Sequence, residues 1–225
     1  MRSNVDIFYC WVEKRLPKAS FEELLKTLPI GVVNRIQRFH RWEDAYSCLI
    51  GYKLIESYVL RGHQSWAAFQ TNPYGKPYLK DGPFFNTTHS GSLVVLSVAN
   101  FEIGIDVELI KEYDYKSLLS EVASPVEKQR IFNSSDPLTA FYNYWTQKEA
   151  CIKQIGKGLS ISLKSFEITE ENAACIEARK LKLLNVKISA KDYVLNLAVP
   201  YDLFNNSIEF VINTNSINMC ELLKI

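Results

Sequence analysis

The sequence lacks the features that mark several common classes of protein. Its 225 residues include 26 basic and 25 acidic residues, a formal net charge of +1, so it has no charge excess typical of a general nucleic-acid binder. The five cysteines form no Cys-x-x-Cys pair, which predicts reduced thiols and a cytoplasmic location. We expect no export and no membrane partner, because no apolar signal region or membrane-length apolar stretch is seen. A Gly-x-x-x-x-Gly-Lys-Ser/Thr loop for triphosphates is also missing.

The composition is that of a compact globular protein. At 47% hydrophobic and 23% charged residues, the chain can bury one large core or two small ones. Apolar spacing predicts helices at residues 21–28, 35–60, 115–122, 126–132 and 138–155, the last ended by Gly156 and Gly158. Strands are predicted at residues 5–11, 94–99, 165–169, 181–189, 193–199 and 208–213.

Two short stretches carry three carboxylates. Along an extended segment alternate residues share a face, so Asp106 and Glu108 point the same way. On the helix at residues 138–155, positions four apart share a face, so Trp145, Glu149 and Lys153 line up. Three carboxylates without His or Cys form an oxygen-only set that suits a hard cation such as Mg²⁺. Together with the lysine, they indicate a magnesium-pyrophosphate site.

Each stretch alone has an ordinary structural interpretation. A Glu followed by a Lys four residues later is the commonest decoration of a solvated helix, as with Glu149 and Lys153. Asp106 and Glu108 fit the solvated face of a strand equally well. A third stretch, residues 86–91 (Asn-Thr-Thr-His-Ser-Gly), favours the functional interpretation. It places His89 in an expected hydroxyl-rich turn that offers several donors to a phosphate oxygen.

Taken in order, these stretches resemble the signature of the 4′-phosphopantetheinyl transferases, and of the long Sfp-type branch in particular. The matching motifs are Gly75-Lys76-Pro77, residues 86–90, residues 104–108, residues 145–153 and residues 156–159. They lie within about residues 34–159, and the flanks fit only in length and pattern. The resemblance implies an α+β fold of two similar subdomains related by a pseudo-twofold axis, each with a long helix packed on an antiparallel sheet. We expect the boundary at Gly104, giving subdomains 1–103 and 104–225.

The resemblance also implies an activity. It is the transfer of the 4′-phosphopantetheine arm of coenzyme A to a serine of an apo acyl, peptidyl or aryl carrier protein, with release of 3′,5′-ADP. A monomeric cytoplasmic enzyme of secondary metabolite biosynthesis is implied as well. Two alternatives remain open from the residues: a non-catalytic protein that binds carrier proteins or coenzyme A, and another Mg²⁺-dependent nucleotide enzyme.

Roles for single residues follow from the same resemblance. Mg²⁺ would be held by Asp106, Glu108 and Glu149. Glu149 would accept the serine proton, directly or through a water, and Lys153 would stabilise or protonate the departing phosphate. With these two, His89 completes the expected catalytic residues. The residues expected to contact coenzyme A are Arg35, Arg38, Lys76, Pro77, Thr88, His89 and Lys153.

Two of these assignments leave a structural alternative. Arg35 and Arg38 also fit a solvated basic helix face. Downstream of the acidic strand, Leu118, Leu119 and Val122 fit either a docking surface for the carrier protein or a packed core.

Overall fold

Two four-stranded sheets organise the chain. The computed structural model describes residues 2–60, 65–112, 114–204 and 209–224. The strands of the first sheet, in sheet order, are β10 (Glu209–Ile217), β1 (Arg2–Trp11), β5 (Leu93–Ala99) and β4 (Phe84–Ser90). Those of the second are β6 (Gly104–Leu109), β9 (Tyr193–Pro200), β8 (Arg179–Asn185) and β7 (Ala173–Ile176). A hairpin of β2 (Phe69–Thr71) and β3 (Pro77–Leu79) stands beside the first sheet.

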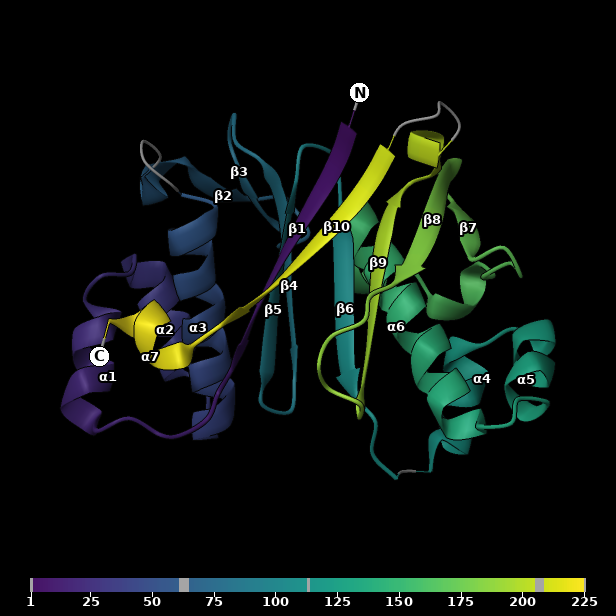
Figure 1. Cartoon of the computed structure of the whole chain (residues 1–225), viewed down its shortest axis with the longest axis horizontal. Coiled ribbons are helices and arrows are strands. Elements are labelled where there is room, and N and C mark those ends of the chain that lie inside the picture. Colours follow the sequence, from purple (N-terminus) through teal and green to yellow (C-terminus); the bar gives the residue numbers. More distant parts are fainter. Residues whose placement is uncertain (1, 61–64, 113, 205–208, 225) are drawn as a thin grey trace.

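Helices cover the outer faces of both sheets (Figure 1). On the first side lie α1 (Lys18–Leu25), α2 (Ile30–Gln37), α3 (Trp42–Tyr58) and the short α7 (Met219–Leu223). On the second lie α4 (Leu119–Val122), α5 (Pro125–Phe132) and α6 (Pro137–Ile155). The two long helices are equivalent: α3 packs on β5, and α6 packs on β6 and β9. The α+β class with one long helix on each sheet is therefore confirmed.

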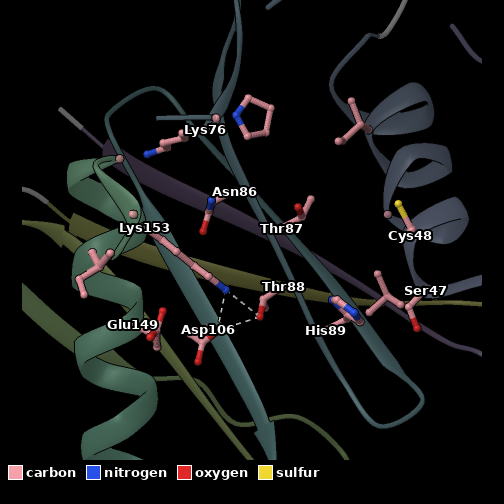
Figure 2. Close-up of a pocket in the computed structure, with 18 of the residues that line it drawn as sticks. Ser47, Cys48, Lys76, Asn86, Thr87, Thr88, His89, Asp106, Glu149 and Lys153 are labelled. Carbon is pink, nitrogen blue, oxygen red and sulfur yellow. Dashed lines mark hydrogen bonds and ion pairs between the residues drawn. The ribbon is translucent and has the colours of Figure 1, made fainter. Parts of the chain in front are cut away.

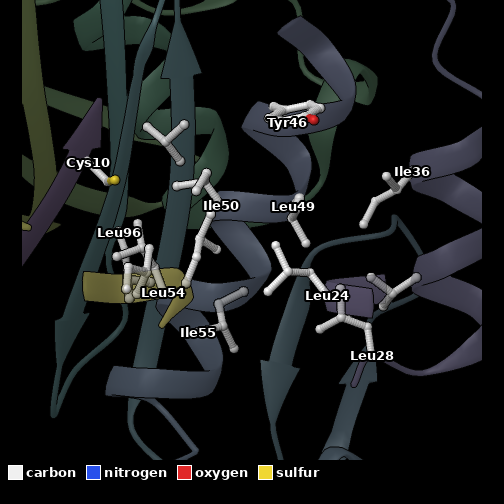
Figure 3. Packing of buried hydrophobic residues seen from close by; sticks show 14 of the residues in the cluster. Cys10, Leu24, Leu28, Ile36, Tyr46, Leu49, Ile50, Leu54, Ile55 and Leu96 are labelled. Atoms are coloured by element: carbon white, nitrogen blue, oxygen red, sulfur yellow. The ribbon is translucent and has the colours of Figure 1, made fainter. Parts of the chain in front are cut away.

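Alternation along the strands places the core in layers. One face of the first sheet packs on α3, where Leu49, Ile50 and Leu54 are completely buried near Leu96 (Figure 3). The other face packs against the second sheet, with residues of β1 and β5 in one apolar cluster with those of β6 and β9. A further cluster lies between α6 and the far side of the second sheet. The layers therefore follow one another as helix, sheet, sheet and helix. Strands β4 and β6, which are edge strands of the two sheets, lie against each other.

The C-terminal segment returns to the first half of the molecule. Strand β10 pairs with β1 in parallel, from Arg2 opposite Glu209 to Cys10 opposite Ile217, whereas the other pairs are antiparallel. The first sheet is therefore mixed and not purely antiparallel. The division into residues 1–103 and 104–225 stays a prediction. It assigns β10 and α7 to the second subdomain, although β10 pairs with β1 of the first sheet and α7 contacts α3.

Several local predictions are wrong. The helix expected at residues 35–60 is two helices, because the backbone becomes extended at Arg41 (φ −89°, ψ 134°). Glu43 and Asp44 then occupy the first turn of α3, where the free N–H groups of a helix favour acidic side chains. Residues 86–90 belong to strand β4, not to a turn. Residues 165–169 form no strand, and β7 was not predicted.

The choice between docking surface and core is settled for two of the three apolar residues. Leu119 is 3% exposed and Val122 is 1% exposed. Both pack with Ile131 and Phe141 in a cluster of buried residues under α6, while Leu118 is partly buried at its margin. The predicted strand at 208–213 is present as β10, with Ile208 outside the described residues. Among the described residues, no helix is long and apolar enough to cross a membrane.

Candidate functional site

A cavity of about 570 Å³ lies between the two halves, a size within the range of small-molecule sites. Its wall on the first side comes from α3, the β2–β3 turn and β4, and on the second side from β6 and α6. Figure 2 shows Thr87 and His89 on the side of α3, with Thr88 turned to the opposite side, toward Asp106 and Lys153. This division follows from the strand conformation of β4, in which successive side chains point to opposite faces.

Asp106 and Lys153 form the centre of the second wall. Lys153 Nζ lies 2.6 Å from Asp106 Oδ1 and donates to Thr88 Oγ1 at 3.1 Å. The Thr88 hydroxyl donates in turn to Asp106 Oδ1 at 2.9 Å and accepts the Val107 N–H at 3.3 Å. Asp106 is 5% exposed, and its Oδ2 is buried with no hydrogen-bond partner among the described residues. A buried carboxylate oxygen without a donor is a favourable position for a cation.

The other two predicted ligands line the same cavity as Asp106. Burial raises the pKa of the Glu149 carboxyl, and the negative charges of Asp106 and Glu108 raise it further. Burial also raises the pKa of Glu108, against the hydrogen bond that Ser90 donates to it. Among the described residues, no three His, Cys, Asp or Glu side chains are spaced as a preformed metal site. The oxygen-only donor set and the open Oδ2 of Asp106 fit a hard cation that draws the carboxylates together.

Gly104 allows α6 to approach β6 closely. A Cβ at Gly104 would lie 2.0 Å from the carbonyl oxygen of Ala150 and 2.4 Å from the backbone nitrogen of Gln154. Any side chain at this position would push the helix away from the strand. The glycine therefore sets the distance from Asp106 and Glu108 on β6 to Glu149 and Lys153 on α6.

Lys76 is placed at the cavity but is bound to backbone. Its Nζ donates to the carbonyl oxygens of Gln154 at 3.0 Å and Ile103 at 3.3 Å. Asn72 Nδ2 donates to the Gly156 carbonyl oxygen at 2.7 Å. The bonds to Gln154 and Gly156 satisfy carbonyls at the end of α6, where a helix lacks internal donors. Burial lowers the pKa of Lys76 to about 8, and its expected contact with a phosphate stays a prediction.

The remaining predicted contacts divide between cavity and surface. Arg35, Pro77 and His89 line the cavity, whereas Arg38 follows the end of α2 and is not part of the lining. His89 is exposed at one side. Its partial burial lowers the pKa of the imidazole, and the positive charge of Lys153 lowers it further. The structure thus brings Arg35 to the site and leaves Arg38 on the surface.

The sequence analysis did not predict a buried ion pair made by Lys148, the residue directly before Glu149. Lys148 Nζ lies 2.8 Å from Glu127 Oε2, and both side chains are 0% exposed. Lys148 also donates to the carbonyl oxygens of Leu163 and Phe166, each at 2.8 Å. The only signal in the sequence was the capping pattern Ser124-x-x-Glu127, because α5 does begin with that capping box.

Comparisons with known proteins identify the family of the chain. The family model of the 4′-phosphopantetheinyl transferase superfamily matches residues 102–198. The 4′-phosphopantetheinyl transferase Sfp of Bacillus subtilis (strain 168) is 32% identical over 168 residues, covering 72% of this chain and 75% of that protein. The 4′-phosphopantetheinyl transferase gsp of Aneurinibacillus migulanus is 34% identical over 178 residues, covering 76% and 74%. The chain therefore belongs to the 4′-phosphopantetheinyl transferase superfamily, and its relatives are of the Sfp type.

Proposed function

We propose that this enzyme transfers the 4′-phosphopantetheine arm of coenzyme A to a serine of an apo carrier protein and releases 3′,5′-ADP. The observation that carries the proposal is the convergence of Asp106, Glu108, Glu149 and Lys153 on one cavity between the two halves. Two anionic phosphates repel an incoming serine oxygen, so a site for this reaction needs a lysine and a cation beside them. The carboxylates supply ligands for that cation, and Lys153 supplies the second positive charge.

Mg²⁺ would be held by Asp106, Glu108 and Glu149. When bound, it would neutralise charge on the pyrophosphate and polarise the phosphorus that the serine attacks. Support comes from the Asp106 Oδ2, which has no donor within the described part of the chain. Burial is the main cause of the raised pKa values of Glu108 and Glu149, and the charge of Asp106 raises both further; a bound cation would offset both effects.

Two residues of α6 would move protons and stabilise charge. Glu149 would accept the serine proton, a role that its raised pKa favours because a carboxylate of higher pKa is the stronger base. Lys153 would stabilise the phosphate that leaves as 3′,5′-ADP. Arg35, Lys76, Pro77, Thr88 and His89 would orient coenzyme A. His89 would act with its imidazole neutral, as its lowered pKa favours.

The partner and setting follow from the same proposal. The carrier would be an acyl, peptidyl or aryl carrier protein, in a pathway of secondary metabolism. The five cysteines are all free in the structure, which supports a reducing cytoplasm as the location. We propose that the enzyme works as a monomer, because one chain supplies every residue assigned above to the metal and coenzyme A.

Two variants on α6 test this function. Glu149→Gln keeps the shape but removes charge and basicity, so kcat for transfer should fall about 100-fold or more, with a small change in KM for coenzyme A. Lys153→Met should lower kcat and also raise KM for coenzyme A, because the cation acts in binding and in the step that develops charge. Turnover would be followed by the mass increase of the apo carrier protein.

The matched control is a second Glu–Lys pair on a helix surface. Glu23 of α1 and Lys26, which follows the end of that helix, form an exposed ion pair at 2.5 Å, so Glu23→Gln and Lys26→Met should leave turnover within about twofold. If Glu149→Gln or Lys153→Met behaves like its control, that residue has no part in the mechanism.

A further inference from the structure

Side chains, and not backbone pairing, join the edges of the two sheets. Strands β4 and β6 lie against each other, yet they belong to different sheets. Alternate side chains of β4 accept the backbone N–H groups that β6 presents at its free edge. The three bonds run to Asn86 Oδ1 from Ile105 N (2.9 Å), to Thr88 Oγ1 from Val107 N (3.3 Å) and to Ser90 Oγ from Leu109 N (3.1 Å). We call Asn86, Thr88 and Ser90 the side-chain ladder; it satisfies an edge that would otherwise be unpaired.

Each hydroxyl of the ladder also donates to a carboxylate of β6. Thr88 donates to Asp106 Oδ1 at 2.9 Å, and Ser90 donates to Glu108 Oε2 at 2.6 Å. The remaining member, Asn86, stands at the level of Gly104, which has no side chain to receive a bond. The ladder therefore fixes the register of the two strands and the direction of both acidic side chains in the same contacts.

The two carboxylates of β6 differ in the donors that hold them. Asp106 is held by Lys153 as well as by Thr88, whereas Ser90 is the one hydrogen-bond donor recorded for the Glu108 carboxylate among the described residues. A glutamate has several freely rotating bonds, and the negative charge of Asp106 repels Glu108. Without a donor, the carboxylate would turn away from its neighbour and toward solvent.

We propose that Ser90 is a positioning residue, which holds the Glu108 carboxylate beside Asp106 so that both reach the same cation. The proposal rests on the proposed function, in which these two carboxylates are metal ligands. It assigns Ser90 no contact with coenzyme A, although Ser90 follows His89 directly in the sequence. Groups that orient metal ligands typically affect metal affinity or activity by about 10–100-fold.

Ser90→Ala tests this role, with Ser92→Ala as the matched control. Ser92 lies two residues further on, exposed in the turn between β4 and β5. Binding of Mn²⁺ to the full chain, followed by electron paramagnetic resonance, should weaken about tenfold or more in Ser90→Ala. Transfer to an apo carrier protein should lose a similar factor in kcat, with KM for coenzyme A within about twofold. Exchange of the Leu109 amide hydrogen should accelerate about tenfold, while that of Val107, bound by Thr88, should stay within about threefold.

Two further variants test the role of the Ser90 hydroxyl even if Ser90→Ala is unstable. Ser90→Thr retains the hydroxyl and should restore Mn²⁺ affinity and kcat. Ser90→Cys keeps the shape but has a weak donor and acceptor, so it should fold and still bind Mn²⁺ poorly.

The outcomes separate the two proposals. If Ser90→Ala and Ser90→Cys match Ser92→Ala in Mn²⁺ affinity, the positioning role is wrong, and transfer by the unchanged protein would leave the proposed function intact. A loss of kcat with unchanged Mn²⁺ affinity would also overturn it. If Mn²⁺ affinity and Leu109 exchange respond as predicted but the unchanged protein transfers nothing, the ladder stands and the proposed function fails.

Discussion

The Thr88 hydroxyl illustrates how single residues at this site are already committed to partners. Its proton goes to Asp106, and its oxygen accepts from Lys153 and from the Val107 N–H. A hydroxyl has one proton to donate and two lone pairs, so this one has none left for a phosphate. Thr88 therefore serves coenzyme A best through Asp106 and Lys153, and its loss should lower kcat more than it raises KM.

The two arginines expected to contact coenzyme A should differ in their effect on its binding. Arg35 lines the cavity, and Arg38 does not. If Arg35 contacts the 3′-phosphate, Arg35→Ala should raise KM for coenzyme A about tenfold or more but leave KM for 3′-dephospho-coenzyme A nearly unchanged, since only the first has that charge. Arg38→Ala is the matched control and should change both within about twofold. An equal rise for both substrates in Arg35→Ala would return this residue to a solvated basic face.

Among the helices and strands, residue periodicity predicted the regular elements. It did not predict β4, whose side chains take the place of backbone hydrogen bonds to the edge of the second sheet. The faces of β6 and α6 followed from spacings of two and four residues, and Gly156 does end α6 with φ 77°. The break before Trp42 was missed, because apolar residues of α2 and α3 keep the same period through it. The polar residues 86–90 predict a turn, but they form strand β4, because alternate polar side chains bond to the edge of the neighbouring sheet, which sequence pattern does not reveal.

The buried ion pair of Lys148 and Glu127, between α6 and α5, should contribute strongly to the stability of the fold. Lys148→Met leaves the Glu127 carboxylate buried without its cation, so the free energy of unfolding should fall by about 3–5 kcal/mol. Urea denaturation would measure it. Lys164→Met is the control, because the Lys164–Glu121 pair is exposed and should contribute at most about 1 kcal/mol. Equal effects of the two substitutions would show that the buried pair does not hold α5 to α6.

At the scale of the whole molecule, the site exists only where the two halves meet. Lys76 from the first half binds carbonyls at the end of α6 and before β6. The ladder joins β4 to β6, and β10 crosses back to pair with β1. The convergence of these residues on one site was predicted from the match of the sequence motifs to the family pattern. The contacts that hold the halves together involve Asn72, Lys76 and Ser90 in roles that depend on the geometry of both sheets.

The Lys76 contact predicts a pH dependence of stability. Burial lowers its folded pKa to about 8 from an ordinary 10.5, so between these pH values the unfolded chain binds more protons. The free energy of unfolding should therefore rise with pH across this window, relative to Lys76→Met, by about 1.4 kcal/mol for each unit of pKa difference. Below pH 8 the difference between the two proteins should be constant. Denaturation at a series of pH values would test it, and a difference that falls from pH 8 to 10.5 would contradict the lowered pKa.

The function proposed for this chain is transfer of phosphopantetheine with the help of carboxylates that hold Mg²⁺. The most direct measurement is intact-mass spectrometry of an apo carrier protein incubated with coenzyme A, Mg²⁺ and either the unchanged enzyme or Asp106→Ala. We predict that the unchanged enzyme adds the mass of one phosphopantetheine, that chelation of Mg²⁺ stops the reaction, and that Asp106→Ala adds none although it remains folded. An unmodified carrier with the unchanged enzyme would contradict the proposed function, and full modification by Asp106→Ala would contradict the role of the carboxylates.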